Sequence, residues 1–325
     1  MNNKRFLTHN QQMKKLNKEK LIKCEGSEHK TLLERNGYFN LANAYKIPFT
    51  VAGAQLPRGE KQVYLKGTSI DDLYSLKCFD EELRAILFKY LTRIEEEIRV
   101  FSSYKFDEIN GKGKNFWYEV SAYNPLAPVS DVMKTISTIY SAIERNSSSY
   151  VKFYMNEHKF IPTWIMIRVI NFSSLIYWIF ASKYEVRDSI CTLYGLDLNT
   201  NPTSLLEGCL HWIRIVRNAC AHNERIFCLT TSSRFYEYYF QQLNTRYNRT
   251  SKKHLMDLFV YCKYFLSESD FNGMIGDIRE KLLELQQTID ILPFARVRNA
   301  MGIKKLTDLD KLMAIPKPQR ITYRI

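Results

Sequence analysis

Arg217, Asn218 and His222, in the segment RNACAHN, are the residues whose types and spacing most favour chemistry. RNA carries its own nucleophile, the 2′-hydroxyl, so its cleavage needs a base, an acid for the departing 5′ oxygen, and positive charge on the phosphate. Histidine suits the proton transfers because its unperturbed pKa is roughly 6.5. Arginine can grip two phosphate oxygens at once. Asn218 lies one helical turn before His222 and can orient the ring or the phosphate. These residues predict phosphodiester cleavage that requires neither a metal nor another cofactor.

A helix is predicted to carry these residues over 205–223. Ser204 and Glu207 have the spacing of a capping box, in which each side chain satisfies a backbone N–H at the helix start. At 100° per residue, apolar residues form one arc that faces the core, and polar residues gather on another face. That polar face carries Glu207, Arg214, Arg217, Asn218, His222 and, if the helix extends that far, Arg225. Its three arginines, amide and imidazole predict phosphate binding, and His211 nearby is a further candidate for RNA contact.

One such helix supplies a single histidine beside the arginine, whereas cleavage profits from both a base and an acid. We therefore hypothesise that two copies of the helix face each other across a homodimer. Each copy would donate Arg217 and His222 to a composite cleft. An active but strictly monomeric enzyme would contradict this hypothesis.

Positive charge is concentrated at the two ends of the chain, whose net charge is +13. Residues 1–31 hold eight Lys or Arg against three Asp or Glu, and residues 293–325 hold eight against two. This distribution favours binding to a nucleic acid, because Lys and Arg release counterions condensed on phosphates. Solvated tails and an acidic membrane surface are the alternative interpretations. The first tail residues that we expect to contact RNA phosphates are Lys304, Lys305 and Arg320.

Composition and periodicity predict an all-α protein. The chain has only 12 Gly and 9 Pro, and apolar residues recur every three or four positions. We predict a helical bundle over 71–292, flanked by a small basic N-terminal module (1–70) and a basic C-terminal tail (293–325). The first helix of the bundle begins at Asp71, and others are expected at about 129–145, 163–184, 205–223, 232–243, 251–266 and 275–292.

The compartment is expected to be the cytoplasm. Seven scattered cysteines without a C-x-x-C pair are typical of reduced thiols, and the N-terminus lacks the apolar run of a secretory signal. The apolar segment 161–181 is long enough to cross a bilayer. It contains Arg168 and Asn171, however, and an arginine at the bilayer centre costs roughly 2.5 kcal/mol or more. We therefore predict a buried core helix and no membrane partner.

Competing motifs are weaker. Arg249 and His254 repeat the five-residue spacing, but in a polar stretch without an asparagine after the arginine. The chain has no GxxxxGK, HExxH or G-x-S-x-G pattern, so nucleotide hydrolysis, zinc proteolysis and α/β-hydrolase chemistry are unsupported. Glu95, Glu97 and Arg99 are expected on a solvated or ion-paired face that could border the site.

The motif and its surroundings resemble the Abi-like (AbiD/AbiF) family of the HEPN superfamily, whose ribonuclease motif is an arginine, four to six residues and a histidine. The similarity extends over LLERNGYFNLANAYKIPF, LYSLKCFDEELRAILFKYLTRIEEEIR and PTWIMIRVINFSSL, and covers about residues 31–227. It implies a HEPN-like helical bundle with catalytic Arg217 and His222 and a supporting Asn218. Arg168 stands where the pattern has a carboxylate, so the acidic partner of Arg217 is either missing or supplied by Glu95 or Glu97.

The resemblance implies an RNA-cleaving toxin of bacterial phage defence, and some members of the family are thought to be controlled by a small RNA. We therefore expect a metal-independent endoribonuclease that leaves 2′,3′-cyclic phosphate ends. Two alternatives remain: a non-cleaving RNA-binding protein that forms a ribonucleoprotein with a small regulatory RNA, and a helical scaffold without RNA affinity.

Overall fold

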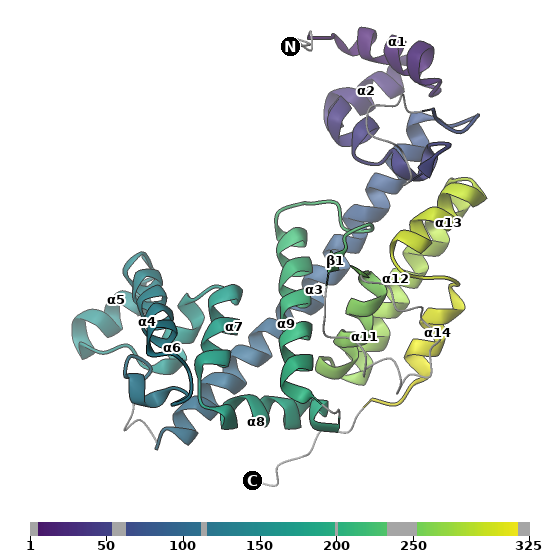
Figure 1. Cartoon of the computed structure of the whole chain (residues 1–325). Helices are drawn as coiled ribbons and strands as arrows, with labels where there is room; N and C mark the ends of the chain where they lie inside the picture. Colours follow the sequence, from purple (N-terminus) through teal and green to yellow (C-terminus); the bar gives the residue numbers. More distant parts are fainter. Residues whose placement is uncertain (1–5, 54–62, 112–115, 199–200, 233–251, 318–325) are drawn as a thin grey trace.

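The computed structural model describes residues 6–53, 63–111, 116–198, 201–232 and 252–317. Most of these residues are helical, which confirms the all-α class (Figure 1). Their one sheet is a short antiparallel pair of β1 (Thr231–Ser232) and β2 (Lys252–Lys253). The α-helices are α1 (His9–Lys20), α2 (Gly26–Asn36), α3 (Ile70–Ile109), α4 (Val129–Glu144), α5 (Ser149–Phe153), α6 (Thr163–Val169), α7 (Phe172–Ala181), α8 (Tyr184–Tyr194), α9 (Pro202–Ala221), α11 (Leu255–Phe265), α12 (Glu268–Thr288), α13 (Ile291–Ala300) and α14 (Thr307–Ala314). Shorter π- and 3₁₀-helical turns are η1 (Phe39–Asn43), η2 (Ile47–Phe49), η4 (Val120–Ala122), η5 (Tyr154–His158) and η6 (Leu196–Leu198).

The long helix α3 is the spine of the molecule. It has 40 residues, and at 1.5 Å per residue it is roughly 60 Å long. Ser69 and Asp72 form a capping box at its start, each side chain accepting the backbone N–H of the other. In Figure 1, α3 runs diagonally from the N-terminal module with α1 and α2 to the lobe with α4–α7. Along this length it contacts α6, α8, α9 and α12.

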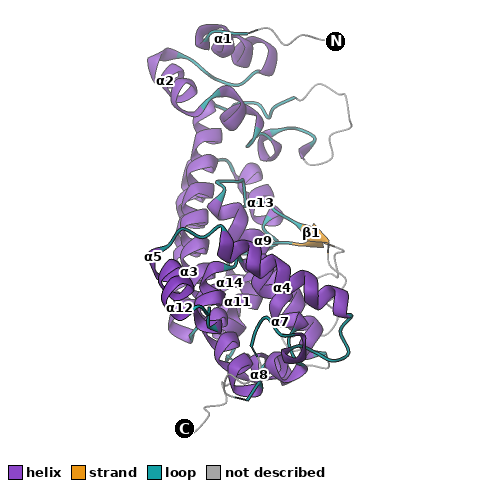
Figure 2. Ribbon diagram, turned by 90° about the vertical axis from the view of Figure 1, so that its left-hand side faces the viewer, coloured by secondary structure: helices purple, strands orange, loops and turns teal. Residues whose placement is uncertain are grey.

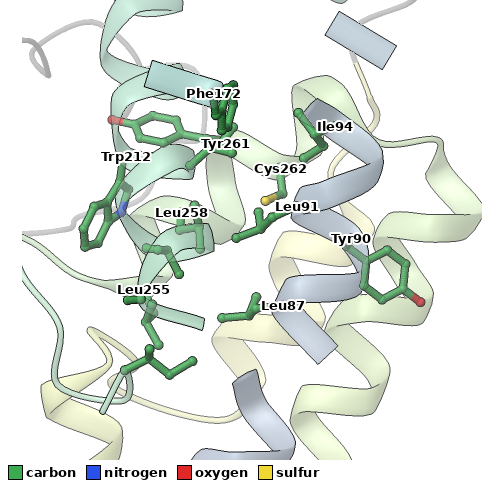
Figure 3. Close-up of a cluster of buried hydrophobic side chains, with 14 of the residues drawn as sticks. Leu87, Tyr90, Leu91, Ile94, Phe172, Trp212, Leu255, Leu258, Tyr261 and Cys262 are labelled. Carbon is green, nitrogen blue, oxygen red and sulfur yellow. The ribbon is translucent and has the colours of Figure 1, made fainter. Parts of the chain in front are cut away.

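A buried apolar cluster joins α3 to α9 and α11. Figure 3 shows Leu87, Leu91 and Ile94 of α3 near Leu258 of α11, with Trp212 of α9 on the other side of α11. All are buried, and burying a large apolar side chain contributes about 2 kcal/mol. This packing holds α9, the helix predicted to carry the chemistry, against the spine.

The apolar segment 161–181 is not a single helix, so the helix predicted over 163–184 is wrong. Asn171 caps α7 by accepting the Ser174 N–H at 2.9 Å, and the chain is extended at Ile170. The carbonyl oxygens of Ile167 and Ile170 accept hydrogen bonds from Arg99 Nη1 at 2.5 and 2.7 Å. These bonds satisfy acceptors at the end of α6, where intrahelical donors run out. In the described part of the chain, no helix is long and apolar enough to span a membrane.

Other predicted boundaries differ in similar ways. The helix expected over 275–292 is divided into α12 and α13, because the chain is extended at Ile289 and Asp290. The helix expected from residue 251 begins at Leu255, since β2 precedes it. The helix expected over 232–243 lies outside the described residues except for Ser232, which is in β1.

The C-terminal segment is largely folded onto the rest of the chain. Arg296 of α13 donates to the carbonyl oxygens of Pro48 and Thr50 in the N-terminal module. Lys263 of α11 donates to the Leu312 carbonyl at the end of α14. The C-terminal helices α13 and α14 therefore contact both the N-terminal module and the helical body, and the side view in Figure 2 shows α13 beside the other helices. The division at residues 70 and 292 remains a proposal about domain organisation.

Candidate active site

The start of α9 differs from the prediction. The Asn201 side chain accepts the Ser204 N–H at 3.2 Å, and Pro202 is the first helical residue. Proline suits this position because its φ is preset and no N–H bond is lost there. Asn201 is therefore the cap, and the capping box predicted for Ser204 and Glu207 is wrong.

The end of α9 places His222 directly after the last helical residue. The His222 N–H donates to the Asn218 carbonyl at 2.9 Å, and Asn223 adopts a left-handed conformation with φ 57°. The Glu224 N–H donates to the Ala219 carbonyl at 2.9 Å. These bonds form a Schellman motif, in which asparagine is one of the few residues that replaces glycine. The side chain of His222 is exposed, and Arg225 lies in the following turn rather than on the helix.

Arg217 turns toward the spine. Its Nη2 is 2.5 Å from Oε2 of Glu95 on α3, and its Nη1 donates to Asn218 Oδ1 at 2.9 Å. The guanidinium carbon is 6.0 Å from the ring centroid of Phe172 on α7, the range of a cation–π contact. The Arg217 side chain is 25% exposed, against 7% for Glu95. The guanidinium is thus oriented by an anion, an amide and a ring while part of it faces solvent.

Glu95 is shared by two arginines. Its Oε1 is 2.5 Å from Nη2 of Arg99, one turn further along α3. Because the two arginines share one carboxylate, the cluster of Arg217, Glu95 and Arg99 keeps a net positive charge. Glu95 is thus the acidic partner of Arg217. Arg168 does not take part in this cluster and forms an exposed ion pair with Glu96 at 3.3 Å. Glu95 and Arg99 are ion-paired, as expected, but buried rather than solvated.

Arg217 and His222 lie at opposite edges of the polar face of α9. Five residues along a helix correspond to a rotation of about 140° between them and a rise of roughly 7.5 Å. Asn218 and His222, four residues apart, differ by about 40°. Arg217 is accordingly next to the core-facing arc, and Asn218 lies between Arg217 and His222 on the polar face.

The other predicted residues of α9 lie along the same face. Nη1 of Arg214 donates to the Ser173 hydroxyl of α7 at 3.2 Å. His211 Nε2 is 3.9 Å from the Glu207 carboxylate. Burial, with the nearby charge of Arg214, lowers the pKa of His211 despite the opposing effect of Glu207. A neutral imidazole is therefore favoured at this position.

The predicted C-terminal contacts are not brought to this cluster. Lys304 and Lys305 are exposed between α13 and α14, and neither takes part in the described contacts around Arg217. Arg320 lies outside the described residues. Within the described ranges, no group of three or more His, Cys, Asp and Glu side chains could hold a metal ion.

A second acid–arginine pair on α3 holds the chain that follows His222. Asp80 accepts the backbone N–H of Phe227 at 2.8 Å and that of Ile226 at 3.1 Å. Arg84 Nη1 is 2.6 Å from the Asp80 carboxylate and donates to the Glu224 carbonyl at 3.1 Å. Burial raises the pKa of Asp80, against the opposing effect of these donors. The sequence analysis did not predict this cluster. An Asp and an Arg four residues apart, at positions of α3 that are otherwise apolar, could have indicated it.

His254, from the competing pair of Arg249 and His254, has a structural role. The backbone N–H of His254 donates to Asp257 at 2.7 Å, and its Nδ1 is 3.0 Å from the Ala300 carbonyl. His254 thus joins the start of α11 to the end of α13. Arg249 lies outside the described residues.

Comparison with known proteins agrees with the similarity found in the sequence. The family model described as Abi-like protein matches residues 31–228, more than half of the chain, and this range includes α3, α9 and the turn after His222. The chain belongs to the Abi-like protein family. No curated protein and no solved structure matches it.

Proposed function

We propose that this chain is a metal-independent endoribonuclease of a bacterial abortive-infection system, with a HEPN-like bundle, that acts in the cytoplasm. The observation that carries the proposal is the guanidinium of Arg217, a partly exposed cation oriented by Glu95 and Asn218, five residues before the exposed His222. Membership of the Abi-like family supports the role in phage defence. The free state of all seven cysteines is consistent with a reducing compartment.

In the proposed reaction, His222 accepts the proton of a ribose 2′-hydroxyl, and the oxygen attacks the adjacent phosphorus. The bond from phosphorus to the 5′ oxygen breaks, and an acid donates a proton to that oxygen. The products are a 2′,3′-cyclic phosphate and a 5′-hydroxyl. Arg217 donates hydrogen bonds to the phosphate as negative charge develops there. Glu95 is a positioning residue, because it contacts Arg217 and not the RNA.

The acid is proposed to be His222 of a second copy of the chain. One copy supplies a single histidine, His222, at the end of α9 beside Arg217, whereas the reaction needs two proton transfers. A homodimer in which the ends of α9 face each other would bring two arginines and two histidines to one cleft. The exposure of His222 is compatible with such a contact.

RNA cleavage in EDTA tests the activity. The purified chain should cleave RNA in the presence of EDTA and leave cyclic phosphate ends, and His222→Ala should lose the cleavage while keeping the same thermal unfolding midpoint. Intact RNA that is nevertheless bound tightly would instead support a non-cleaving protein that forms a ribonucleoprotein with a small regulatory RNA. If the chain neither binds nor cleaves RNA, the helical scaffold is the interpretation that remains.

Mixing experiments test the shared cleft. When wild-type chains are mixed and re-equilibrated with a fourfold excess of His222→Ala chains, about one in five wild-type chains pairs with another wild-type chain, so activity per wild-type chain should fall about fivefold. Activity per wild-type chain that stays constant would refute the dimeric arrangement and leave the assignment of Arg217 and His222 intact.

A further inference from the structure

The turn that follows His222 is held against the N-terminal module. The ring of Tyr45 stacks on that of Phe227 with centroids 6.2 Å apart and an interplanar angle of 21°. The Tyr45 hydroxyl also donates to Asp80 at 3.1 Å, the same carboxylate that accepts the Phe227 N–H. Asp80 thus holds a residue of the N-terminal module and the turn after α9 in one place.

This contact brings three cations together. Lys46 follows Tyr45 in the chain, and the guanidinium carbon of Arg225 is 6.0 Å from the ring centroid of Phe227. Burial lowers the pKa of Lys46, and the nearby charges of Lys20, at the end of α1, and of Arg225 lower it further. Lys20 and Arg225 are therefore both near Lys46, although Lys20 precedes the family-matched residues 31–228 and Arg225 lies near their end.

No carboxylate neutralises these cations in the described structure. Lys20, Lys46 and Arg225 form no ion pair among the described residues. Glu19 and Glu224, which precede Lys20 and Arg225 in the sequence, are exposed and do not pair with them. The three side chains are half-buried, so their mutual repulsion is less screened than on an open surface. Binding of an anion would offset this repulsion.

We infer that Lys20, Lys46 and Arg225 form a binding site for a backbone phosphate of the RNA strand, next to the phosphate at which cleavage occurs. This inference rests on the proposed function and gives the N-terminal module a role in holding the substrate. Arg225 is three positions after His222, so their Cα atoms are at most about 11 Å apart. A single RNA strand can therefore contact both positions. The site reads the backbone and contributes affinity rather than base specificity.

The experiment measures RNA binding separately from cleavage. His222→Ala serves as the parent chain, and a fluorescent single-stranded RNA is titrated by anisotropy at several salt concentrations. Adding Lys46→Ala or Arg225→Ala should each weaken binding several-fold and reduce the slope of log K against log salt by about 0.7. Lys46→Arg, which keeps the charge, should restore the slope. Lys18→Ala and Lys66→Ala remove exposed lysines of the same module outside this cluster and should leave the slope unchanged.

The outcomes separate this inference from the proposed function. If Lys46→Ala and Arg225→Ala leave the slope of log K against log salt unaltered, the phosphate site is refuted, even if the wild-type chain cleaves RNA. Reduced slopes without any cleavage by the wild-type chain would support the phosphate site and refute the nuclease. Vesicles containing phosphatidylserine are the competing ligand. If these two substitutions weaken binding to the vesicles but not to RNA, the site is a membrane contact and the inference fails.

Discussion

The two acid–arginine pairs of α3 have the same spacing and different effects. Asp80 and Arg84, like Glu95 and Arg99, are four residues apart and buried. Asp80 accepts bonds from backbone N–H groups of the turn after α9. Glu95 is paired instead with a side chain, the partly exposed Arg217. Asp80 therefore fixes the backbone of the turn, whereas Glu95 orients the Arg217 guanidinium, which can still bind a ligand.

This difference indicates which property distinguishes a functional charge from a structural one. Burial and ion pairing are common to both carboxylates, and a buried pair is weak evidence for added stability. The distinguishing feature is the partner. A backbone N–H has no capacity left once it is bonded, whereas a guanidinium has five donors and can keep some for a substrate.

Removing Arg217 should have the largest effect. Arg217→Ala leaves both pairs of α3 in place, because Glu95 keeps Arg99, but removes the cation from the phosphate. We expect kcat/KM for RNA to fall about a thousandfold, the loss typical of a donor to a developing anion. The thermal unfolding midpoint should change little. RNA cleavage at the wild-type rate by this variant would end the assignment of the site.

Breaking the Asp80 pair should mainly affect stability. Arg84→Met leaves a buried carboxylate without its cation, which costs about 3 kcal/mol. Urea unfolding of wild type and variant measures the difference. We expect RNA cleavage by the folded fraction to change far less than in Arg217→Ala. If Arg84→Met were as stable as the wild type but no longer cleaved RNA, the Asp80 pair would have the functional role and this interpretation would be wrong.

Glu95→Gln should have the opposite pattern to Arg84→Met. The amide keeps the shape of the side chain and removes the charge that orients Arg217, so we expect a loss of about tenfold to a hundredfold in kcat, with a smaller loss of stability. Single-turnover cleavage at saturating RNA measures the rate of the chemical step. A change in KM alone would show that Glu95 affects RNA binding rather than the orientation of Arg217.

Lys263 shows what burial does to a cation that is held by carbonyl groups. Its Nζ donates to the carbonyl oxygens of Leu312 and Met313, and burial lowers its pKa to about 8, against the opposing effect of Glu268. Between pH 8 and the ordinary value near 10.5, the unfolded chain binds a proton that the native chain has released. Stability relative to Lys263→Met should therefore rise with pH in this window, by at most about 1.4 kcal/mol per pH unit. Urea unfolding at pH 7, 9 and 10 checks this, and equal pH profiles of the two chains would contradict it.

Much of the fold followed from local patterns. The periodicity predicted the start of α3 and the end of α4 to within one residue, and the start of α4 at the observed residue. The predictions were wrong where a polar residue ended a helix inside an apolar run, as at Asn171, or where proline moved a helix start, as at Pro202. Periodicity alone favours continuing such a helix, because the residues on either side of the break remain apolar.

For the candidate site, the sequence by itself determined which groups share α9, since positions on one helix follow from a constant rotation per residue. It also offered Glu95 as one of two possible acidic partners for Arg217, the other being Glu97. Only the tertiary structure decided that Glu95 is the partner, that Asp80 holds the turn after His222, and that Lys46 lies near Arg225. These contacts join residues far apart in the chain, and they depend on how the long helix packs against its neighbours rather than on any local spacing.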